Sequence, residues 1–313
     1  MNIFSDIAKA CNQSLNSFGI HAECYLLPGG IGIKFNAQNQ NNLQLLADFP
    51  IVEVDLSEIE DFDFSYLNQS RISSIILPPN YSRPFKDLEV FNLQKLAVRN
   101  AQASDFESLS NQPIQDLKLP GSKINCLRFC SEMPLKNLDL SNTKVTDLNP
   151  VKDANIYSLN LAKTNVSDIS CLSTIYFEEI NLSATEILDI EPISLAKNLK
   201  KLEIRSTKIS DLQPLSETNI EELILPGTMV ESISTLSYVP IKNLNIIGLH
   251  LDYLSSLETM PIEFLAFSPE LMSKDNLNFI KTLSIKNLRG PTDLNYLGCN
   301  DFVEKYKNLF QPD

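Results

Sequence analysis

The stretch PLKNLDLSNTKVTDLNPVKDA, from Pro134 to Ala154, decides the fold, because the next 21 residues repeat it almost position for position. This second copy, NIYSLNLAKTNVSDISCLSTI, runs from Asn155 to Ile175. Apolar residues, a threonine and an aspartate return at the same places in both copies. A fixed period of this length indicates a repeat architecture, in which each unit packs mainly against its two neighbours.

Three columns of apolar residues extend the repeat over most of the chain. Their step is 21 residues everywhere except between Phe177 and Leu199, where it is 22. The first column contains Ile51, Ile72, Leu93, Ile114, Leu135, Ile156, Phe177, Leu199, Ile220, Ile241 and Ile262. The other two columns, which pass through Leu138 and Leu140, follow three and five residues later. Agreement over eleven units predicts a solenoid that begins near residue 50.

The apolar–polar–apolar triplet in each unit, such as Leu138 to Leu140, predicts a short strand with two side chains in the core. The phrase Asp-Leu-x-Pro-Leu that follows favours short turns or 3₁₀ pieces, because aspartate caps a turn and proline stops a helix. We therefore interpret the aspartate column as turn caps rather than as a calcium site. Its members are Asp105, Asp147, Asp168, Asp189 and Asp211.

A second polar column lies at the bend after each strand. Its members are Asn80, Ser122, Thr143, Thr164, Thr185, Thr207 and Thr228. A buried bend carries backbone groups that the strand ladder does not satisfy, and a short hydroxyl or amide can bond to them. We predict that these side chains make such bonds from one unit to the next.

The repeat resembles the leucine-rich-repeat family in its short bacterial form of 21–22 residues, with threonine where the family often has asparagine. The resemblance covers roughly residues 50 to 285, and NDFVEKYKNLF, from Asn300 to Phe310, is similar to the segment that closes such arrays. It implies an α/β repeat: a leucine-rich-repeat solenoid with a parallel sheet on the concave face and short turns or 3₁₀ pieces on the convex face. It also implies that the concave face binds a ligand.

The first 48 residues do not follow the repeat. Ile7, Cys11 and Leu15 recur at helical spacing, and two short apolar runs flank the turn residues Pro28–Gly30. They predict a helix and a β-hairpin, which would cover the exposed end of the array. A polar connection, NAQNQNN from Asn36 to Asn42, follows. We expect three parts: an N-terminal cap over 1–48, an array of about 11 units over 49–283 and a C-terminal cap over 284–313.

Composition limits the classes of partner. The chain has a net charge of −13, and such a surface repels nucleic acids and anionic membranes, so we expect neither as a partner. No apolar run approaches the roughly 20 residues of a membrane span. The first residues lack the basic start and apolar core of a signal peptide. We expect a cytoplasmic monomer with reduced cysteines, and export by an unconventional route is the alternative.

We expect no catalytic residue, no metal and no cofactor. The two histidines, His21 and His250, are interpreted as structural or surface residues. Cys126 and Cys130 have CxxxC spacing, but no second pair accompanies them, and Cys130 falls on a core position, so we interpret it as a buried thiol. The stretch PGGIGIK, from Pro28 to Lys34, has neither the Walker spacing nor a following helix.

The residues that flank the two core positions of each strand point to the opposite face of the sheet. This face carries acidic and basic side chains in similar numbers, with small residues such as Ser141 and Ala162 in the middle and apolar points such as Ile76. Its basic members are Lys95, Arg99, Lys118, Lys201 and Arg205. The binding residues that we predict are Arg99, Lys201, Glu203, Arg205, Asp139 and Glu179. One interpretation is that opposite charges on neighbouring strands pair with one another; the other is that they bind a partner.

These observations favour a non-catalytic protein-binding module of bacterial type: an adaptor, an inhibitor or an exported effector that recognises a protein or peptide through the concave face. A structural or surface-interaction repeat protein without a single ligand is the alternative, and an enzyme is a more remote one.

Overall fold

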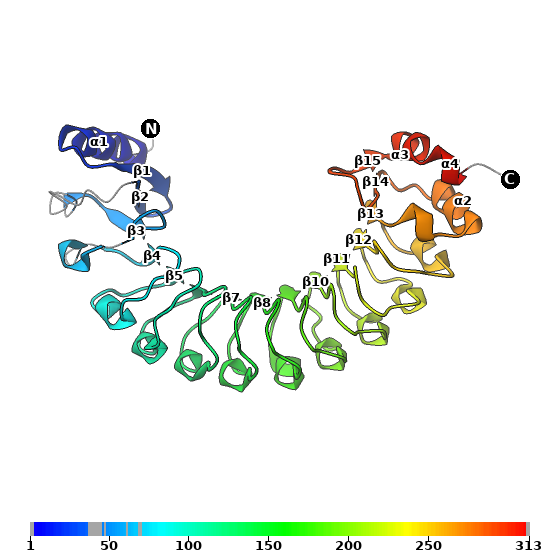
Figure 1. Cartoon of the computed structure of the whole chain (residues 1–313), viewed down its shortest axis with the longest axis horizontal. Coiled ribbons are helices and arrows are strands. Elements are labelled where there is room, and N and C mark those ends of the chain that lie inside the picture. The colour runs from blue at the N-terminus through cyan, green and yellow to red at the C-terminus, as the bar shows by residue number, and fades with distance from the viewer. Residues whose placement is uncertain (1–2, 37–45, 47, 61, 68–70, 311–313) are drawn as a thin grey trace. The chain divides into compact units, whose positions relative to one another are not determined.

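The computed structural model describes residues 3–36, 46, 48–60, 62–67 and 71–310 (Figure 1). The chain forms two compact units, Met1–Val145 and Thr146–Asp313. In each unit the strands lie on one side of the coils and the 3₁₀ turns lie on the opposite side. The predicted polar connection lies, apart from Asn36, outside the described residues. The predicted boundaries of the two caps stay a prediction.

The first unit begins with a helix and a β-hairpin, as the sequence predicts. Helix α1 covers Ile3–Ser17, and the antiparallel strands β1 and β2 cover Ala22–Leu27 and Gly30–Phe35. Gly29 turns the hairpin with a φ of 87°, a conformation that glycine adopts without steric cost. Strand β2 then pairs in parallel with the first strand of the array, so the hairpin continues the sheet.

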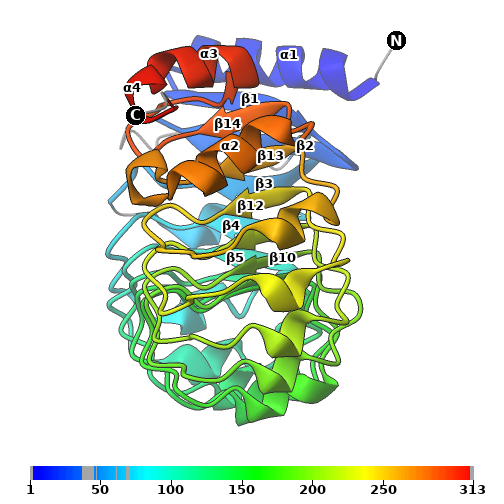
Figure 2. The same ribbon diagram turned by 90° about the vertical axis from the view of Figure 1, so that its right-hand side faces the viewer.

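The parallel strands have three to five residues each and follow one another in chain order within each unit. Those of the first unit are β3 (Ile51–Asp55), β4 (Ser74–Ile76), β5 (Lys95–Ala97), β6 (Asp116–Lys118) and β7 (Asn137–Asp139). Those of the second are β8 (Ser158–Asn160), β9 (Glu179–Asn181), β10 (Lys201–Glu203), β11 (Glu222–Ile224), β12 (Asn243–Asn245), β13 (Phe264–Ala266) and β14 (Asn287–Arg289). Figure 2 shows β12, β13 and β14 one above another.

Short 3₁₀ helices bring the chain back from one strand to the next. The first unit contains η2 (Phe64–Leu67), η3 (Phe85–Leu88), η4 (Phe106–Leu109) and η5 (Arg128–Cys130). The second contains η6 (Asn149–Val151), η7 (Ser170–Thr174), η8 (Glu191–Ile193), η9 (Gln213–Leu215), η10 (Ser234–Leu236), η11 (Ser255–Glu258) and η12 (Pro269–Leu271). The second unit ends with α2 (Lys274–Thr282), the short strand β15 (Leu297–Gly298), which runs antiparallel to β14, and the helices α3 (Cys299–Lys305) and α4 (Lys307–Phe310).

The core confirms the 21-residue register. Leu202 pairs in register with Ile180 on one side and Leu223 on the other, so the apolar columns stack from coil to coil. Leu138 and Leu159 are each only 1% exposed. A shift of one residue would turn these side chains out to solvent, so their burial identifies the strand positions.

The aspartate column caps the turns, as predicted. Asp147, Asp168, Asp189 and Asp211 each accept a hydrogen bond from the backbone N–H two residues later, at 2.8–2.9 Å. Asp105 differs, because its carboxylate accepts the N–H groups of Phe85 and Lys86 in the preceding coil. The column therefore satisfies backbone donors at the start of the return segment.

The threonine column bonds differently from the prediction. The hydroxyls of Thr143, Thr164, Thr185, Thr207 and Thr228 each donate to the carbonyl three residues earlier, in their own coil, at 2.6–2.8 Å. The prediction of bonds from unit to unit was therefore wrong for the threonines. It holds for Ser122, whose Oγ accepts the N–H of Ala101 in the preceding coil at 3.0 Å.

The backbone itself supplies the bond between coils at the bend. The residue before each threonine has a left-handed conformation, with φ from 53° to 74° in Asn142, Lys163, Ala184, Ser206 and Gly227. This turns its N–H toward the next coil, so that Lys163 donates to Ser183 and Ser206 donates to Pro226. The backbone thus makes the bond between coils, and the threonine hydroxyl bonds to a carbonyl of its own coil.

A cluster around Glu53 connects the hairpin to the array. Its carboxylate accepts hydrogen bonds from the hydroxyl of Tyr25 on β1 at 2.7 Å and of Ser74 on β4 at 2.6 Å, and it pairs with the ammonium of Lys95 on β5 at 3.2 Å. Burial alone would raise the pKa of Glu53, but these three partners outweigh it and lower the pKa. Burial, and then the bond to Glu53, raise the pKa of Tyr25.

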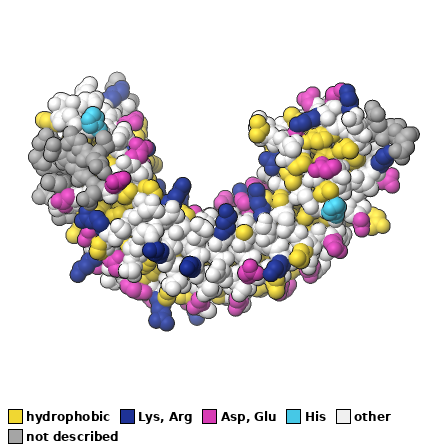
Figure 3. Space-filling view, in the orientation of Figure 1, with side chains coloured by type: hydrophobic (Ala, Val, Ile, Leu, Met, Phe, Trp, Pro, Cys, Tyr) yellow, Lys and Arg dark blue, Asp and Glu magenta, His cyan; other side chains and the backbone are white. Residues whose placement is uncertain are grey.

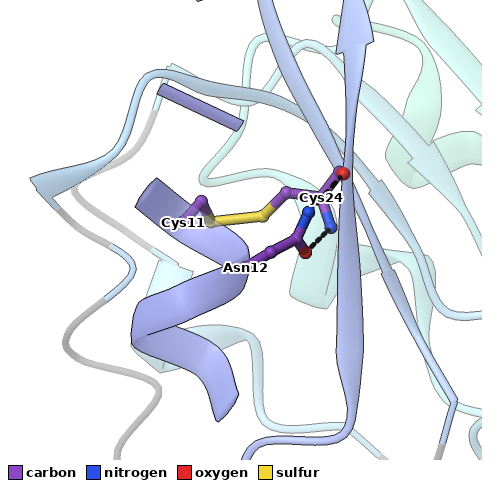
Figure 4. The surroundings of a disulfide bond; sticks show 3 residues. All are labelled: Cys11, Asn12 and Cys24. Atoms are coloured by element: carbon purple, nitrogen blue, oxygen red, sulfur yellow. Dashed lines mark hydrogen bonds between the residues drawn. A yellow bond between two sulfur atoms is a disulfide. The ribbon is translucent and has the colours of Figure 1, made fainter. Parts of the chain in front are cut away.

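Cys11 and Cys24 form a disulfide between α1 and β1, which corrects the expectation that all cysteines are reduced (Figure 4). The amide of Asn12 bonds to both the N–H and the carbonyl of Cys24, at 2.7 and 3.0 Å, and so holds the helix against the strand. Irregular cysteine spacing carries no sign of this pair, because the helix and the hairpin have to pack before the two thiols meet.

The disulfide predicts a thiol count. In urea without reductant, four of the six cysteines should react with a thiol reagent, namely Cys126, Cys130, Cys171 and Cys299. All six should react after reduction. Six reactive thiols before reduction would mean that Cys11 and Cys24 only lie side by side.

Replacing Thr185 by valine should lower the free energy of unfolding by about 1–2 kcal/mol, because it removes the donor to the buried carbonyl of Leu182 without changing the shape of the side chain. Thr185→Ser, which keeps the hydroxyl, is the matched control and should lose less. The measurement is the urea midpoint of both variants and of the native chain. Equal midpoints for Thr185→Val and the native chain would contradict this role.

The Glu53 cluster predicts a pH-dependent contribution to stability. The pKa of Glu53 lies below its unfolded value of about 4.5, so its contribution is full above that pH and is lost as the pH falls through the folded pKa. Glu53→Gln should therefore cost about 2 kcal/mol at pH 7 and progressively less below pH 4.5. Urea unfolding of both proteins from pH 7 to pH 3 measures the difference. A difference that does not change with pH would argue against an ionised Glu53.

Candidate functional site

The sheet has one face against the core and one face open to solvent, here named the strand face. In each coil it consists of three residues: the two that flank the central core residue of the strand, and the residue two positions after the second of these. In the coil of β7 they are Asn137, Asp139 and Ser141. Figure 3 shows basic and acidic side chains interspersed over the visible surface of both units. Whether any part of this face is available for a partner therefore depends on which of the charged side chains pair with one another.

In the second unit the predicted binding residues largely pair with one another. The Lys201 ammonium lies 2.9 Å from Glu222 and 3.3 Å from Glu203, and Glu203 also contacts Arg205 at 3.5 Å. Burial would lower the pKa of Lys201, but the bonds to Glu222 and Glu203 raise it. The pair of Lys201 with Glu222 joins neighbouring strands, as in the first of the two interpretations. Glu203, by contrast, pairs with Lys201 and Arg205 within its own coil.

A hollow of about 180 Å³ lies beside that cluster, lined by Glu179, Lys201 and Glu203 together with other polar and apolar residues of β8 and β9. Next to the strands, Glu221 bridges Lys200 at 2.9 Å and Lys242 at 2.6 Å. The hydrogen bonds from these two lysines lower the pKa of Glu221 to about 2. Charges along this edge therefore neutralise one another.

The first unit contains a larger hollow of about 430 Å³ on its strand face. Its lining residues are Ser57, Ile76, Leu77, Pro79, Ala97, Val98, Arg99, Lys118, Pro120 and Asp139. In register across four strands lie Ile76, Ala97, Lys118 and Asp139, so the short side chain of Ala97 stands between two longer ones. The hollow follows from this difference in side-chain length.

Two cations lie in the first-unit hollow without a carboxylate partner. Arg99 and Lys118 are both exposed, and neither forms an ion pair within the described part of the chain. By contrast, Lys95, in the same coil as Arg99, is paired with Glu53. An exposed, unpaired arginine beside apolar walls is a common binding arrangement, because the flat guanidinium both stacks and donates two parallel hydrogen bonds.

Asp139, a predicted binding residue, also has a structural task. Its Oδ1 accepts the N–H of Ser141 at 2.9 Å. The same bond recurs with Asp55, Asn160, Asn181 and Asn245 at the ends of other strands. Sequence reasoning missed this column, although Asp or Asn after the central leucine of several strands was a visible signal. Lys118 and Ala97 were also missed as site residues, because their importance depends on the unpaired charge and on the hollow.

The histidines and cysteines considered for chemistry do not line the first-unit hollow. His21 and His250 are exposed, Cys126 is exposed and Cys130 is buried. Burial raises the pKa of the Cys130 thiol, so it stays protonated at neutral pH. Within the described ranges, no group of three or more His, Cys, Asp or Glu side chains is arranged to hold a metal ion. The helices in the described part of the chain include none that is long and apolar enough to cross a membrane.

Comparison with known proteins gives matches in structure only. No family model and no curated protein matches the sequence. An internalin from Listeria monocytogenes is 20% identical, with 84% of this chain and 82% of the internalin covered and a TM-score of 0.65. A leucine-rich-repeat protein from Leptospira interrogans is 16% identical, with 83% and 72% covered and a TM-score of 0.59.

The leucine-rich-repeat ectodomain of a plant receptor kinase from Arabidopsis thaliana is also similar. It is 16% identical, with 71% of this chain and 33% of the ectodomain chain covered and a TM-score of 0.51. Identities this low show the fold alone. Together with the buried columns, the parallel strands and the 3₁₀ turns, they show that the chain is a leucine-rich-repeat solenoid of the short type, with coils of 21–22 residues and a threonine column.

Proposed function

We propose that the chain is a non-catalytic protein-binding module that recognises a protein or peptide through its strand face. The observation that carries the proposal is the first-unit hollow, where Arg99 and Lys118 lie beside Ile76 and Ala97 without an ion-pair partner among the described residues. The chain has a net charge of −13, and in its described part neither cation forms an ion pair that would contribute to the fold. They are available to a partner.

The size of the face favours a macromolecular partner. Strands β3 to β7 at about 4.8 Å spacing span roughly 20 Å. An extended peptide can lie across several of these strands, whereas a small metabolite would leave most of the face empty. The plant ectodomain was solved in complex with Casparian strip integrity factor 2, so a solenoid of similar fold does bind another molecule.

The six predicted binding residues have different weights in this proposal. Arg99 and Asp139 lie at the first-unit hollow and are its principal members, with Lys118 added. Glu203 pairs with Lys201 and Arg205, and Lys201 also pairs with Glu222. Together with Glu179, these predicted residues form a secondary surface in the second unit. A partner would have to displace those ion pairs, which makes binding there weaker.

The proposed class is an adaptor, an inhibitor or an effector that acts as a monomer, either in the cytoplasm or after export. Nucleic acids and anionic membranes are not the proposed partners, because the overall charge repels both. A structural repeat protein without a single ligand is the competing function, and it predicts that the strand face can be altered without consequence.

Affinity capture from a cell lysate, read by mass spectrometry, tests the proposal. The strand-face variant Arg99→Glu with Lys118→Glu should lose a partner that the native chain retains. The matched control is Lys123→Glu with Arg128→Glu, which makes the same change of charge at two exposed residues of the return segment in the same unit. The control should retain the partner.

Circular dichroism and the urea midpoint establish that both variants fold. Loss of the partner by both variants would point to a general charge effect, and retention by both would move binding to another surface. Absence of any specific partner for the native chain would favour the structural function.

A further inference from the structure

The apolar part of the first-unit hollow has a defined shape. Ala97 forms its floor, with Ile76 on the neighbouring strand β4 and Lys118 on β6 in register on either side. Pro79 and Pro120 also line it. Its volume of about 430 Å³ falls in the range of ligand pockets in proteins. The hollow is therefore large enough to take one apolar side chain of a partner.

The charges around this hollow favour an anion of limited size. Lys118 is in register with Ala97, the last residue of β5, and Arg99 follows Ala97 by two residues, which makes Arg99 and Lys118 diagonal neighbours. Asp139 is in register with Lys118 on the other side, and one of its oxygens is engaged by the N–H of Ser141. The two cations and one carboxylate leave a local charge of about +1. One carboxylate of a partner balances this charge, and the planar arginine fork matches its geometry.

Long polyanions fit this surface poorly. Asp116 lies on β6, the strand of Lys118, and Asp139 lies on the next strand, β7, whereas Glu53 and Asp55 lie on β3 on the other side. Phosphates that extended beyond the two cations would meet these carboxylates. Charge complementarity therefore favours a short acidic element with an apolar neighbour over a nucleic acid.

We propose that the first-unit hollow binds an extended segment of a partner protein in which an acidic side chain bonds to Arg99 and Lys118 while a neighbouring large apolar side chain fills the space over Ala97. This inference rests on the proposed protein-binding function and names the chemistry of the partner. Arg99 and Lys118 supply the charge recognition, and Ala97 supplies the space for the apolar side chain.

An array of 12-residue peptides with a fixed Leu-x-Glu core and random flanks, probed with the full-length chain, tests the proposal. Matched arrays carry Leu-x-Gln, Leu-x-Lys and Ser-x-Glu cores. Binding should be strongest to Leu-x-Glu. The best peptides, measured by fluorescence anisotropy, should lose at least about tenfold in affinity with Arg99→Gln plus Lys118→Gln. Lys123→Gln plus Arg128→Gln, the control, should leave the affinity unchanged.

A second variant separates the apolar requirement from the charge. Ala97→Phe fills the hollow and leaves both cations in place, so it should also weaken Leu-x-Glu binding by at least about tenfold. Its preference for Glu over Gln should remain. Equal affinity of native chain and Ala97→Phe would overturn the apolar half of the proposal. Equal binding of the Glu and Gln arrays would overturn the charged half.

Three further outcomes would decide against the proposal, and they can be told apart. A 20-nucleotide single-stranded RNA that binds more tightly than the best Leu-x-Glu peptides, and whose binding is lost with Arg99→Gln plus Lys118→Gln, would assign the cations to a nucleic acid. In the second outcome, the chain captures a partner that depends on Arg99 and Lys118 but shows no preference among the peptide arrays. That result would reject the acidic segment as the ligand and retain the protein-binding function. Absence of both a captured partner and peptide binding would overturn both.

Discussion

The dependence of every coil on its neighbours is the constraint from which the rest of this structure follows. A strand of three residues, such as Lys201–Glu203, offers one central core side chain and has no backbone partner within its own coil. Leu202 becomes part of a core only because Ile180 and Leu223 lie in register on either side of it. Stability therefore resides in the interfaces between coils, and the chain has to repeat the same apolar positions to maintain them.

Repetition also explains why most polar columns are structural. Each coil bends sharply after its strand and again before its 3₁₀ turn, and each bend exposes backbone groups that the sheet does not satisfy. Threonine hydroxyls donate to a carbonyl of their own coil, left-handed residues such as Ser206 donate to the next coil, and aspartates such as Asp211 cap the turn. A carboxylate column in such a protein is thus poor evidence for metal or acid–base chemistry, because the backbone already uses it.

The strand face is the part of the coil that these requirements leave variable. Within the described ranges its charges divide into those that are paired, as in Lys201 with Glu222 and Lys95 with Glu53, and those that are not, as in Arg99 and Lys118. Exposed ion pairs contribute little to stability, but they occupy the groups that a partner would need. Unpaired cations next to a hollow are therefore a more selective guide to a binding surface than the number of charged residues on the face.

The sequence by itself determined the period, the strand positions, the buried columns, the turn caps, and the helix and hairpin at the start. It could do so because each rests on local spacing repeated many times, as at Leu138 and Leu159. Arg99 and Asp139 were also found from spacing, as members of the outward face. Only the tertiary structure decided that Lys201 and Arg205 are paired, that Cys11 meets Cys24, and that Ala97 leaves a hollow beside Lys118. These features depend on which side chains meet across neighbouring strands and on how far each one reaches, and a pattern along one chain does not contain that information.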